Sequence, residues 1–152
     1  MTIDARFAHT NLIAEDWHRL ARFYEEILGC TPVPPVRDLS GRWLEASTGI
    51  HGARARGVHL RLPGHGDSGP TLEIFQYDHE EKRVPAAANR PGYGHIAFAV
   101  EDVNSAREAV ISGGGGTLGD TVTVEIPGAG RITFVYATDP EGNVIELQSW
   151  DS

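Results

Sequence analysis

The chain has 152 residues, a length that suits one domain or two small modules joined closely. Its 13 Lys and Arg against 21 Asp and Glu give a formal net charge of -8. That charge argues against nucleic acid as the main partner, because phosphate binding needs a basic surface. No stretch approaches the roughly 18 apolar residues of a membrane span, and the first residues contain Asp4 and lack the apolar run of a signal peptide.

The first predicted elements are a strand and a helix within residues 7–30. Asp16 is a good N-cap, because its short carboxylate can accept a hydrogen bond from a free backbone N–H of the first turn. Gly29 lies where a left-handed residue commonly ends a helix. Apolar residues recur between the two at helical spacing: Trp17, Leu20, Phe23, Tyr24, Ile27 and Leu28. We therefore expect a helix from Asp16 to Gly29, with a strand around His9 before it.

The rest of the first half predicts at least two more strands. Apolar and polar residues alternate in 58–62 and in 69–77, which is typical of strands with one buried face. The pattern is least informative around Trp43 and Leu44, where a further strand is expected without clear ends.

Three other segments receive a structural interpretation. Residues 49–57 are expected to form an irregular loop whose Arg54 and Arg56 lie in solvent, the alternative being that they bind an anionic group of a substrate. Cys30 is interpreted as a packing residue, because the sequence shows no neighbour that would activate it. The glycines of 113–116 lack phosphate-loop spacing and are interpreted as a flexible connection.

The second half begins in the same way as the first. Residues 93–115 contain an apolar run with His95 near its start, Asp102 as a helix N-cap, apolar residues at helical spacing, and Gly113 at the expected left-handed end. A turn signal, Asp-Pro-Glu-Gly at 139–142, follows. Strands are predicted at 122–126, 132–138 and 143–150.

Both halves also end alike, with GPTLEIFQY at 69–77 and GNVIELQSW at 142–150. The pattern in each half therefore predicts the order strand–helix–strand–strand–strand, so the chain contains an internal repeat. We expect a single domain over residues 1–152 made of two modules, about 5–80 and 92–150, with a linker at about 81–91.

One His and one Glu in each half are predicted on the sheet face that points away from the helix. Side chains alternate across a strand, so Glu73, between Leu72 and Ile74, lies opposite these apolar neighbours. The same reasoning applies to the other three: His9, His95 and Glu146. A carboxylate between apolar residues is costly to bury unless it is paired or bound to metal. Two imidazoles and two carboxylates suit one divalent ion such as Zn, Ni, Co, Fe or Mn.

These motifs resemble the vicinal-oxygen-chelate superfamily, which includes glyoxalase I, methylmalonyl-CoA epimerase, extradiol dioxygenases and bleomycin or fosfomycin resistance proteins. The resemblance runs from about residue 7 to 150 and is carried by HTNL with His9, TLEIF with Glu73, GHIAF with His95 and DPEGNVIEL with Glu146. It implies an α+β fold in which two tandem βαβββ modules form a curved, mostly antiparallel eight-stranded sheet around a metal-binding cavity.

The resemblance also implies an activity and a setting. The favoured function is a metal-dependent lyase or isomerase that moves a proton on a small oxygen-bearing substrate, with Glu146 as the base assisted by Glu73. The alternatives are an extradiol-type dioxygenase that uses His9, His95 and Glu146, and a non-catalytic small-molecule or drug-binding resistance protein. We expect a homodimer without nucleic-acid or membrane partners, in a reducing cytoplasm because the only cysteine cannot form an internal disulfide.

Five residues near the proposed ligands are predicted to contact substrate. His59 and Arg61 fall on the face opposite Val58 and Leu60, and an Arg there could hold a carboxylate or phosphate through its planar fork. The alternative for Arg61 is a structural contact at the sheet edge. The remaining three share the sides of His9 and Glu73: Asn11, Phe75 and Tyr77.

Overall fold

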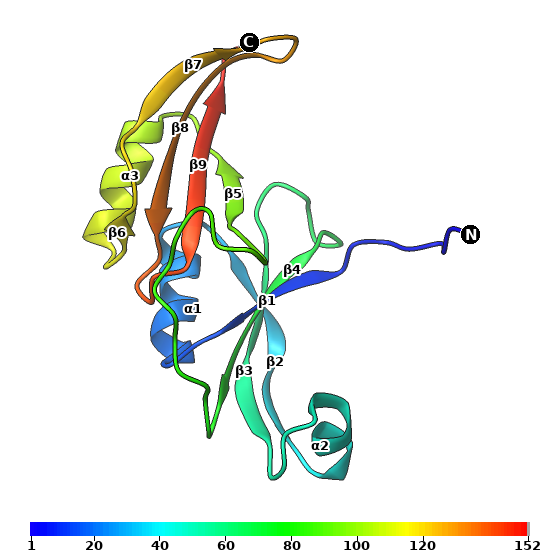
Figure 1. The fold of residues 1–152 in the computed structure, drawn as a ribbon. Coiled ribbons are helices and arrows are strands. Elements are labelled where there is room, and N and C mark those ends of the chain that lie inside the picture. The colour runs from blue at the N-terminus through cyan, green and yellow to red at the C-terminus, as the bar shows by residue number, and fades with distance from the viewer. Residues whose placement is uncertain (152) are drawn as a thin grey trace. The chain divides into compact units, whose positions relative to one another are not determined.

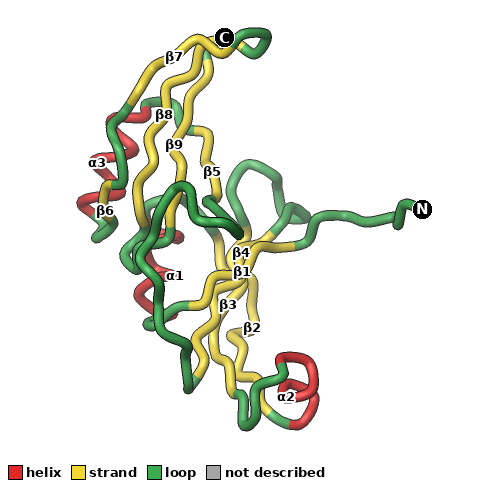
Figure 2. Tube along the Cα trace, viewed as in Figure 1, coloured by secondary structure: helices red, strands yellow, loops and turns green. Residues whose placement is uncertain are grey.

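The computed structural model describes residues 1–151 and divides the chain into two compact units, Met1–Lys82 and Arg83–Ser152. The boundary lies within the predicted linker at 81–91. Residues 78–95 form loops and turns throughout (Figure 2).

The N-terminal unit is a four-stranded mixed sheet with two helices (Figure 1). Its elements are β1 (His9–Ile13), α1 (Trp17–Glu26), β2 (Thr31–Ser40), α2 (Arg42–Thr48), β3 (Arg54–Arg61) and β4 (Thr71–Tyr77). The strand order is β1-β4-β3-β2, with β1 parallel to β4 and the other pairs antiparallel. This order makes β4 and β3 the central strands, and α1 packs on both of them.

The C-terminal unit is a five-stranded mixed sheet covered on one face by a helix (Figure 1). Its elements are β5 (Ile96–Ala99), α3 (Val103–Ser112), β6 (Gly116–Thr117), β7 (Val122–Ile126), β8 (Gly130–Thr138) and β9 (Val144–Trp150). The order is β5-β9-β8-β6, with β7 also paired to β8 and only β5–β9 parallel. The helix α3 packs on the central strands β8 and β9.

The predicted α+β class with tandem, mostly antiparallel modules is confirmed. Among the described residues, nine strands form two sheets of four and five, where eight strands in one sheet were expected. The additional strand is β6, which has only two residues, the first of them in the glycine-rich segment 113–116, and is too short for a pattern that needs four or more residues.

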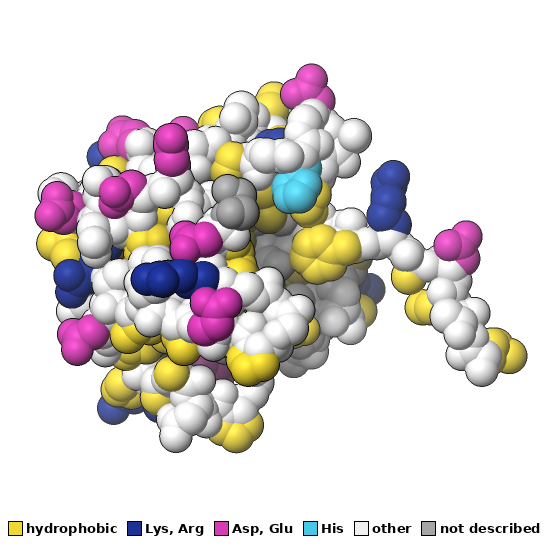
Figure 3. Space-filling view, turned by 90° about the horizontal axis from the view of Figure 1, so that it is seen from above, with side chains coloured by type: hydrophobic (Ala, Val, Ile, Leu, Met, Phe, Trp, Pro, Cys, Tyr) yellow, Lys and Arg dark blue, Asp and Glu magenta, His cyan; other side chains and the backbone are white. Residues whose placement is uncertain are grey.

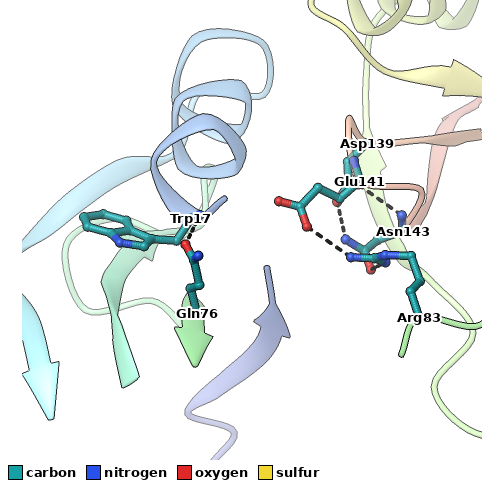
Figure 4. Close-up of polar contacts among 6 residues, drawn as sticks. All are labelled: Trp17, Gln76, Arg83, Asp139, Glu141 and Asn143. Atoms are coloured by element: carbon teal, nitrogen blue, oxygen red, sulfur yellow. Dashed lines mark hydrogen bonds and ion pairs between the residues drawn. The ribbon is translucent and has the colours of Figure 1, made fainter. Parts of the chain in front are cut away.

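Both long helices begin where the sequence predicts. The Asp16 carboxylate accepts a hydrogen bond from Arg19 N at 3.1 Å, and Asp102 accepts one from Ser105 N at 2.7 Å. A second cap comes from the sheet, since the backbone N–H of Trp17 donates to Gln76 Oε1 at 3.2 Å (Figure 4). This contact fixes the start of α1 above the end of β4.

The predicted helix ends are correct in one module and wrong in the other. Gly29 has φ +74°, the left-handed conformation expected after α1. Gly113 has φ -80°, and Gly114 with φ +101° takes the left-handed conformation instead. Four consecutive glycines can all adopt that conformation, so the sequence did not determine which one would.

Two predictions in the first module are wrong. Trp43 and Leu44 belong to the helix α2 rather than to a strand, and β3 begins at Arg54, inside the predicted loop 49–57. The early start of β3 depends on Gly57, where a Cβ would lie 1.9 Å from Ile74 O and 2.6 Å from the Phe75 ring. Only glycine lets the neighbouring strand approach this closely.

Arg54 and Arg56 consequently lie on a strand and not in a loop. The guanidinium of Arg54 donates two hydrogen bonds to the Asp38 carboxylate, at 2.9 and 2.8 Å, and Arg56 donates one to Asp78 at 2.8 Å. The Arg54 guanidinium holds the pKa of the Asp38 carboxyl below its usual range. All four side chains are substantially exposed, so these pairs add little stability.

The surface is acidic without a concentrated patch of either sign on the face shown in Figure 3, where Lys and Arg side chains lie singly among Asp and Glu. The longest helices of the described chain have 10 residues each, and none of its helices is long and apolar enough to cross a membrane.

The turn between β8 and β9 is organised by a buried carboxylate. Asp139 is 2% exposed. Its Oδ1 accepts hydrogen bonds from the backbone N–H groups of Glu141 and Asn143, and its Oδ2 accepts one from Asn143 Nδ2 (Figure 4). Arg83 donates to Glu141 Oε1 at 3.0 Å and ties the start of the unit to the same turn. The turn therefore sets the β8–β9 register, which places Glu146.

Replacing Asp139 should destabilise the protein strongly. Asp139→Ala removes three accepted hydrogen bonds and leaves partly buried N–H groups without an acceptor, so we expect a loss of about 3 kcal/mol in the free energy of unfolding. Urea denaturation followed by circular dichroism measures the loss. Asp120→Ala, at an exposed position, is the control and should change stability by less than about 0.5 kcal/mol. Equal stability of the two variants would contradict this role for the turn.

Cys30 is a core residue, as predicted. It is 5% exposed, and burial, assisted by the charge of Glu25, raises the pKa of its thiol to about 12. A thiol that stays protonated at neutral pH is a poor nucleophile.

This raised pKa predicts how stability depends on pH. The unfolded thiol loses its proton near pH 9 whereas the folded thiol keeps it to about 12, so the free energy of unfolding should fall as pH rises between these values. Chemical denaturation from pH 8 to 11 should show this component in the wild type and not in Cys30→Ala. Native protein should also react slowly with a thiol reagent at pH 8. Parallel pH profiles for the two proteins would contradict the assignment.

Candidate metal centre

Glu73 lies in the middle of the central strand β4 and is largely removed from water. Its side chain is 14% exposed, while its neighbours Leu72 and Ile74 are fully buried on the opposite face. The sheet face that carries Glu73 continues to Phe75, which packs in a small cluster with Leu44 of α2. The carboxylate therefore shares its sheet face with an apolar cluster and lies opposite the buried residues Leu72 and Ile74.

Three side chains surround this carboxylate. Asn11 Nδ2 donates to Glu73 Oε1 at 2.7 Å, because β1 and β4 pair with Asn11 opposite Glu73. His9 Nε2 lies 3.7 Å from the same oxygen. His59 Nε2 lies 2.7 Å from Glu73 Oε2, since His59 is the residue opposite Glu73 on β3. The ligand atoms of His9, His59 and Glu73 all lie within 4.8 Å of one another.

The His59 ring is mostly buried and is surrounded by other side chains. Its side chain is 18% exposed, its Nδ1 lies 3.2 Å from Thr71 Oγ1, and its ring meets those of His9 and Phe75 edge-on at 5.6 and 6.0 Å. Burial lowers the pKa of the imidazole, partly offset by Glu73. A neutral imidazole is the form that ligates metals.

The C-terminal unit carries the corresponding pair. His95, directly before β5, has its Nε2 3.0 Å from Oε2 of Glu146 on β9. Glu146 is 13% exposed, and its neighbours Ile145 and Leu147 are fully buried. The His95 ring lies 5.0 Å from that of Tyr136, the residue opposite Glu146 on β8.

The two units match residue by residue around their glutamates. In each, the parallel partner of the glutamate lies two residues after the histidine, at Asn11 and at Ala97. The antiparallel partner of the glutamate is His59 in one unit and Tyr136 in the other. The repeat inferred from sequence therefore extends to strand register, and the His–Glu pairs occupy equivalent positions.

The residues predicted to contact substrate have varied surroundings. His59 and Asn11 both contact Glu73. Arg61 is half-buried and donates from Nη1 to the carbonyl of Gly69 at 2.5 Å. Phe75 is buried, and Tyr77 packs against the cluster that contains it.

Sequence reasoning did not identify His59 as a possible metal ligand or Tyr136 as its counterpart. Either assignment needs the β3–β4 or β8–β9 register, which depends on the turns between the strands. The turn before β9 gave a clear signal at 139–142, so Tyr136 could have been found by counting back from it. The loop at 62–70 contains no turn signal from which the residue opposite Glu73 could be counted.

Comparison with known proteins identifies the fold and the family. A glyoxalase family protein from Bacillus cereus is 20% identical, with 99% of this chain and 97% of that chain covered and a TM-score of 0.83. A glyoxylase/bleomycin resistance protein/dioxygenase domain from Frankia sp. EAN1pec is 20% identical, with 98% and 100% covered and a TM-score of 0.62.

The fosfomycin resistance protein FosX from Listeria monocytogenes, in a complex with Mn(II) and sulfate, is 14% identical, with 99% and 95% covered and a TM-score of 0.55. These likenesses show the fold. Curated proteins gave no match. The family model of the Glyoxalase/Bleomycin resistance protein/Dioxygenase superfamily matches residues 6–147. The chain thus belongs to this superfamily.

Proposed function

We propose that this protein is a metal-dependent lyase or isomerase of the glyoxalase-like type, which moves a proton on a small oxygen-bearing substrate. The observation that carries the proposal is the pair of His–Glu contacts in equivalent register, His9–Glu73 and His95–Glu146. Under this proposal the four side chains ligate one divalent ion. The FosX relative, whose structure holds Mn(II), supports a metal of this kind.

The donor set fits a divalent cation. Each carboxylate is less than one-sixth exposed and lies beside imidazole nitrogen, so its negative charge needs a nearby positive one. Imidazole nitrogen and carboxylate oxygen together suit Zn, Ni, Co, Fe or Mn. When bound, such an ion would polarise the substrate oxygens and so make an adjacent C–H more acidic.

Glu146 is the better placed of the two carboxylates to accept a proton. Within the described chain Glu73 has three polar neighbours, Asn11, His9 and His59, whereas Glu146 has a single one, His95. A carboxylate with free lone pairs can take a carbon-bound proton and return it. Glu73, held by its neighbours, would mainly bind and orient.

The two alternative functions, a ring-cleaving dioxygenase and a non-catalytic binder, would give different results from the proposed enzyme in one set of assays. A ring-cleaving dioxygenase needs open positions for oxygen, and a fourth protein ligand would take one of them. A non-catalytic binder needs no metal. Metal analysis of protein purified without a metal-affinity tag, followed by assays on α-ketoaldehyde–thiol adducts, acyl-CoA epimers and catechols, distinguishes the three. Metal-dependent turnover of either of the first two substrate classes is the expected result, and turnover of catechols alone would contradict it.

Glu146→Gln should separate catalysis from metal binding. The amide keeps an oxygen that can face the ion but cannot accept the proton, so we expect kcat to fall by about 10²–10⁴. Metal content should change far less. Glu125→Gln, on the exposed strand β7, is the control. If Glu146→Gln retains full activity, the base is another group, with Glu73 the next candidate.

Arg61→Ala should weaken substrate binding if the substrate carries an anionic group. Arg61 uses one N–H on Gly69, and its guanidinium has further donors for a carboxylate or phosphate. We expect KM to rise about tenfold or more, with kcat and metal content unchanged. Arg56→Ala, on the opposite face of the same strand, is the matched control. A lower Tm with unchanged KM would show that Arg61 only anchors the loop at Gly69.

A further inference from the structure

The two units differ at one position beside their equivalent glutamates. The residue across the antiparallel ladder is His59 in the N-terminal unit and Tyr136 in the C-terminal unit. A neutral imidazole nitrogen is a good ligand for divalent metals, and a protonated phenol is a poor one. The N-terminal unit therefore has one potential ligand more than the repeat requires.

The distances in the N-terminal cluster are close to those of a metal site. Metal–ligand bonds of 2.0–2.1 Å in tetrahedral geometry separate the ligand atoms by roughly 3.3 Å. In this unit Glu73 Oε2 lies 2.7 Å from His59 Nε2, and Glu73 Oε1 lies 3.7 Å from His9 Nε2. These two contacts differ from that separation by about 0.6 and 0.4 Å, and the ligand atoms of all three residues lie within 4.8 Å of one another.

The surrounding groups favour the same arrangement. Metal-bound histidines commonly use the second ring nitrogen in a hydrogen bond, and His59 Nδ1 lies 3.2 Å from Thr71 Oγ1. If Nδ1 carries the proton, Nε2 presents its lone pair to the Glu73 carboxylate, and a cation between the two groups would stabilise this contact. Asn11 fixes the other carboxylate oxygen by donating to it at 2.7 Å.

We propose that His9, His59 and Glu73 form a three-ligand site through which the N-terminal unit binds a divalent cation without His95 and Glu146. The inference shares His9 and Glu73 with the proposed function and adds His59 as a ligand. In consequence, the N-terminal unit would keep the ion even when the pair in the C-terminal unit is removed.

The test uses the full chain with the C-terminal pair removed, His95→Ala/Glu146→Ala. Competition with a chromophoric chelator should show that this double variant still binds one Zn²⁺ per chain. Adding His59→Ala should raise the Kd for Zn²⁺ more than about 100-fold, because a direct ligand matters more than the outer-sphere groups whose loss costs 10–100-fold. Pulsed EPR of the Cu²⁺-loaded proteins should detect two coordinated imidazoles in the double variant and one after His59→Ala.

Two controls separate ligand loss from general damage. Tyr136→Phe changes the equivalent position in the other unit and should leave Zn²⁺ binding unchanged. His51→Ala removes an imidazole that is fully exposed and lies outside the cluster, and should do the same. If His59→Ala disturbs folding by circular dichroism, His59→Phe keeps the ring volume while removing both nitrogens.

Loss of stoichiometric Zn²⁺ binding in a folded double variant would overturn the inference, as would an unchanged Kd on adding His59→Ala. These outcomes leave the proposed function standing if the wild type holds metal and turns over substrate. Conversely, Zn²⁺ retained by the double variant, without metal-dependent turnover by the wild type, would support the N-terminal site and refute the proposed enzyme.

Discussion

A carboxylate that is mostly withdrawn from water, in the middle of a central strand, is the constraint around which each unit is built. Glu73 and Glu146 each lie between two fully buried apolar residues that anchor their strand beneath a helix. Burying the strand is favourable, but it brings the charged group along and leaves it on the opposite face. The unit therefore needs polar neighbours on that face.

The parallel strand beside each glutamate supplies the first of these neighbours. His9 of β1 and His95, directly before β5, lie beside the carboxylate, each two residues before the strand residue that pairs with the glutamate. The antiparallel strand supplies the second, and here the units differ, with His59 in one and Tyr136 in the other. Two copies of one architecture thus place different side chains, an imidazole and a phenol, beside their carboxylates.

Elements remote from the carboxylates determine how accurately they are placed. The Asp139 turn sets the β8–β9 register, and Gly57 allows β3 to approach β4 closely enough for His59 to face Glu73. The α2 helix, which covers Phe75 through Leu44, closes the apolar end of the same sheet face.

The sequence alone determined the features that depend on local pattern. Asp16 and Asp102 start helices because a short carboxylate satisfies the first-turn N–H groups, and the faces of Glu73 and Glu146 follow from strand alternation. Only the tertiary structure decided which strands lie beside one another and in what register. Residues 62–70 contain no turn signal that fixes the register of the strands on either side, so the pairing of His59 with Glu73 could not be predicted. Any of the glycines at 113–116 could take the left-handed conformation, so Gly114 could not be predicted either. Long-range pairing depends on packing of the whole sheet, which no short segment encodes.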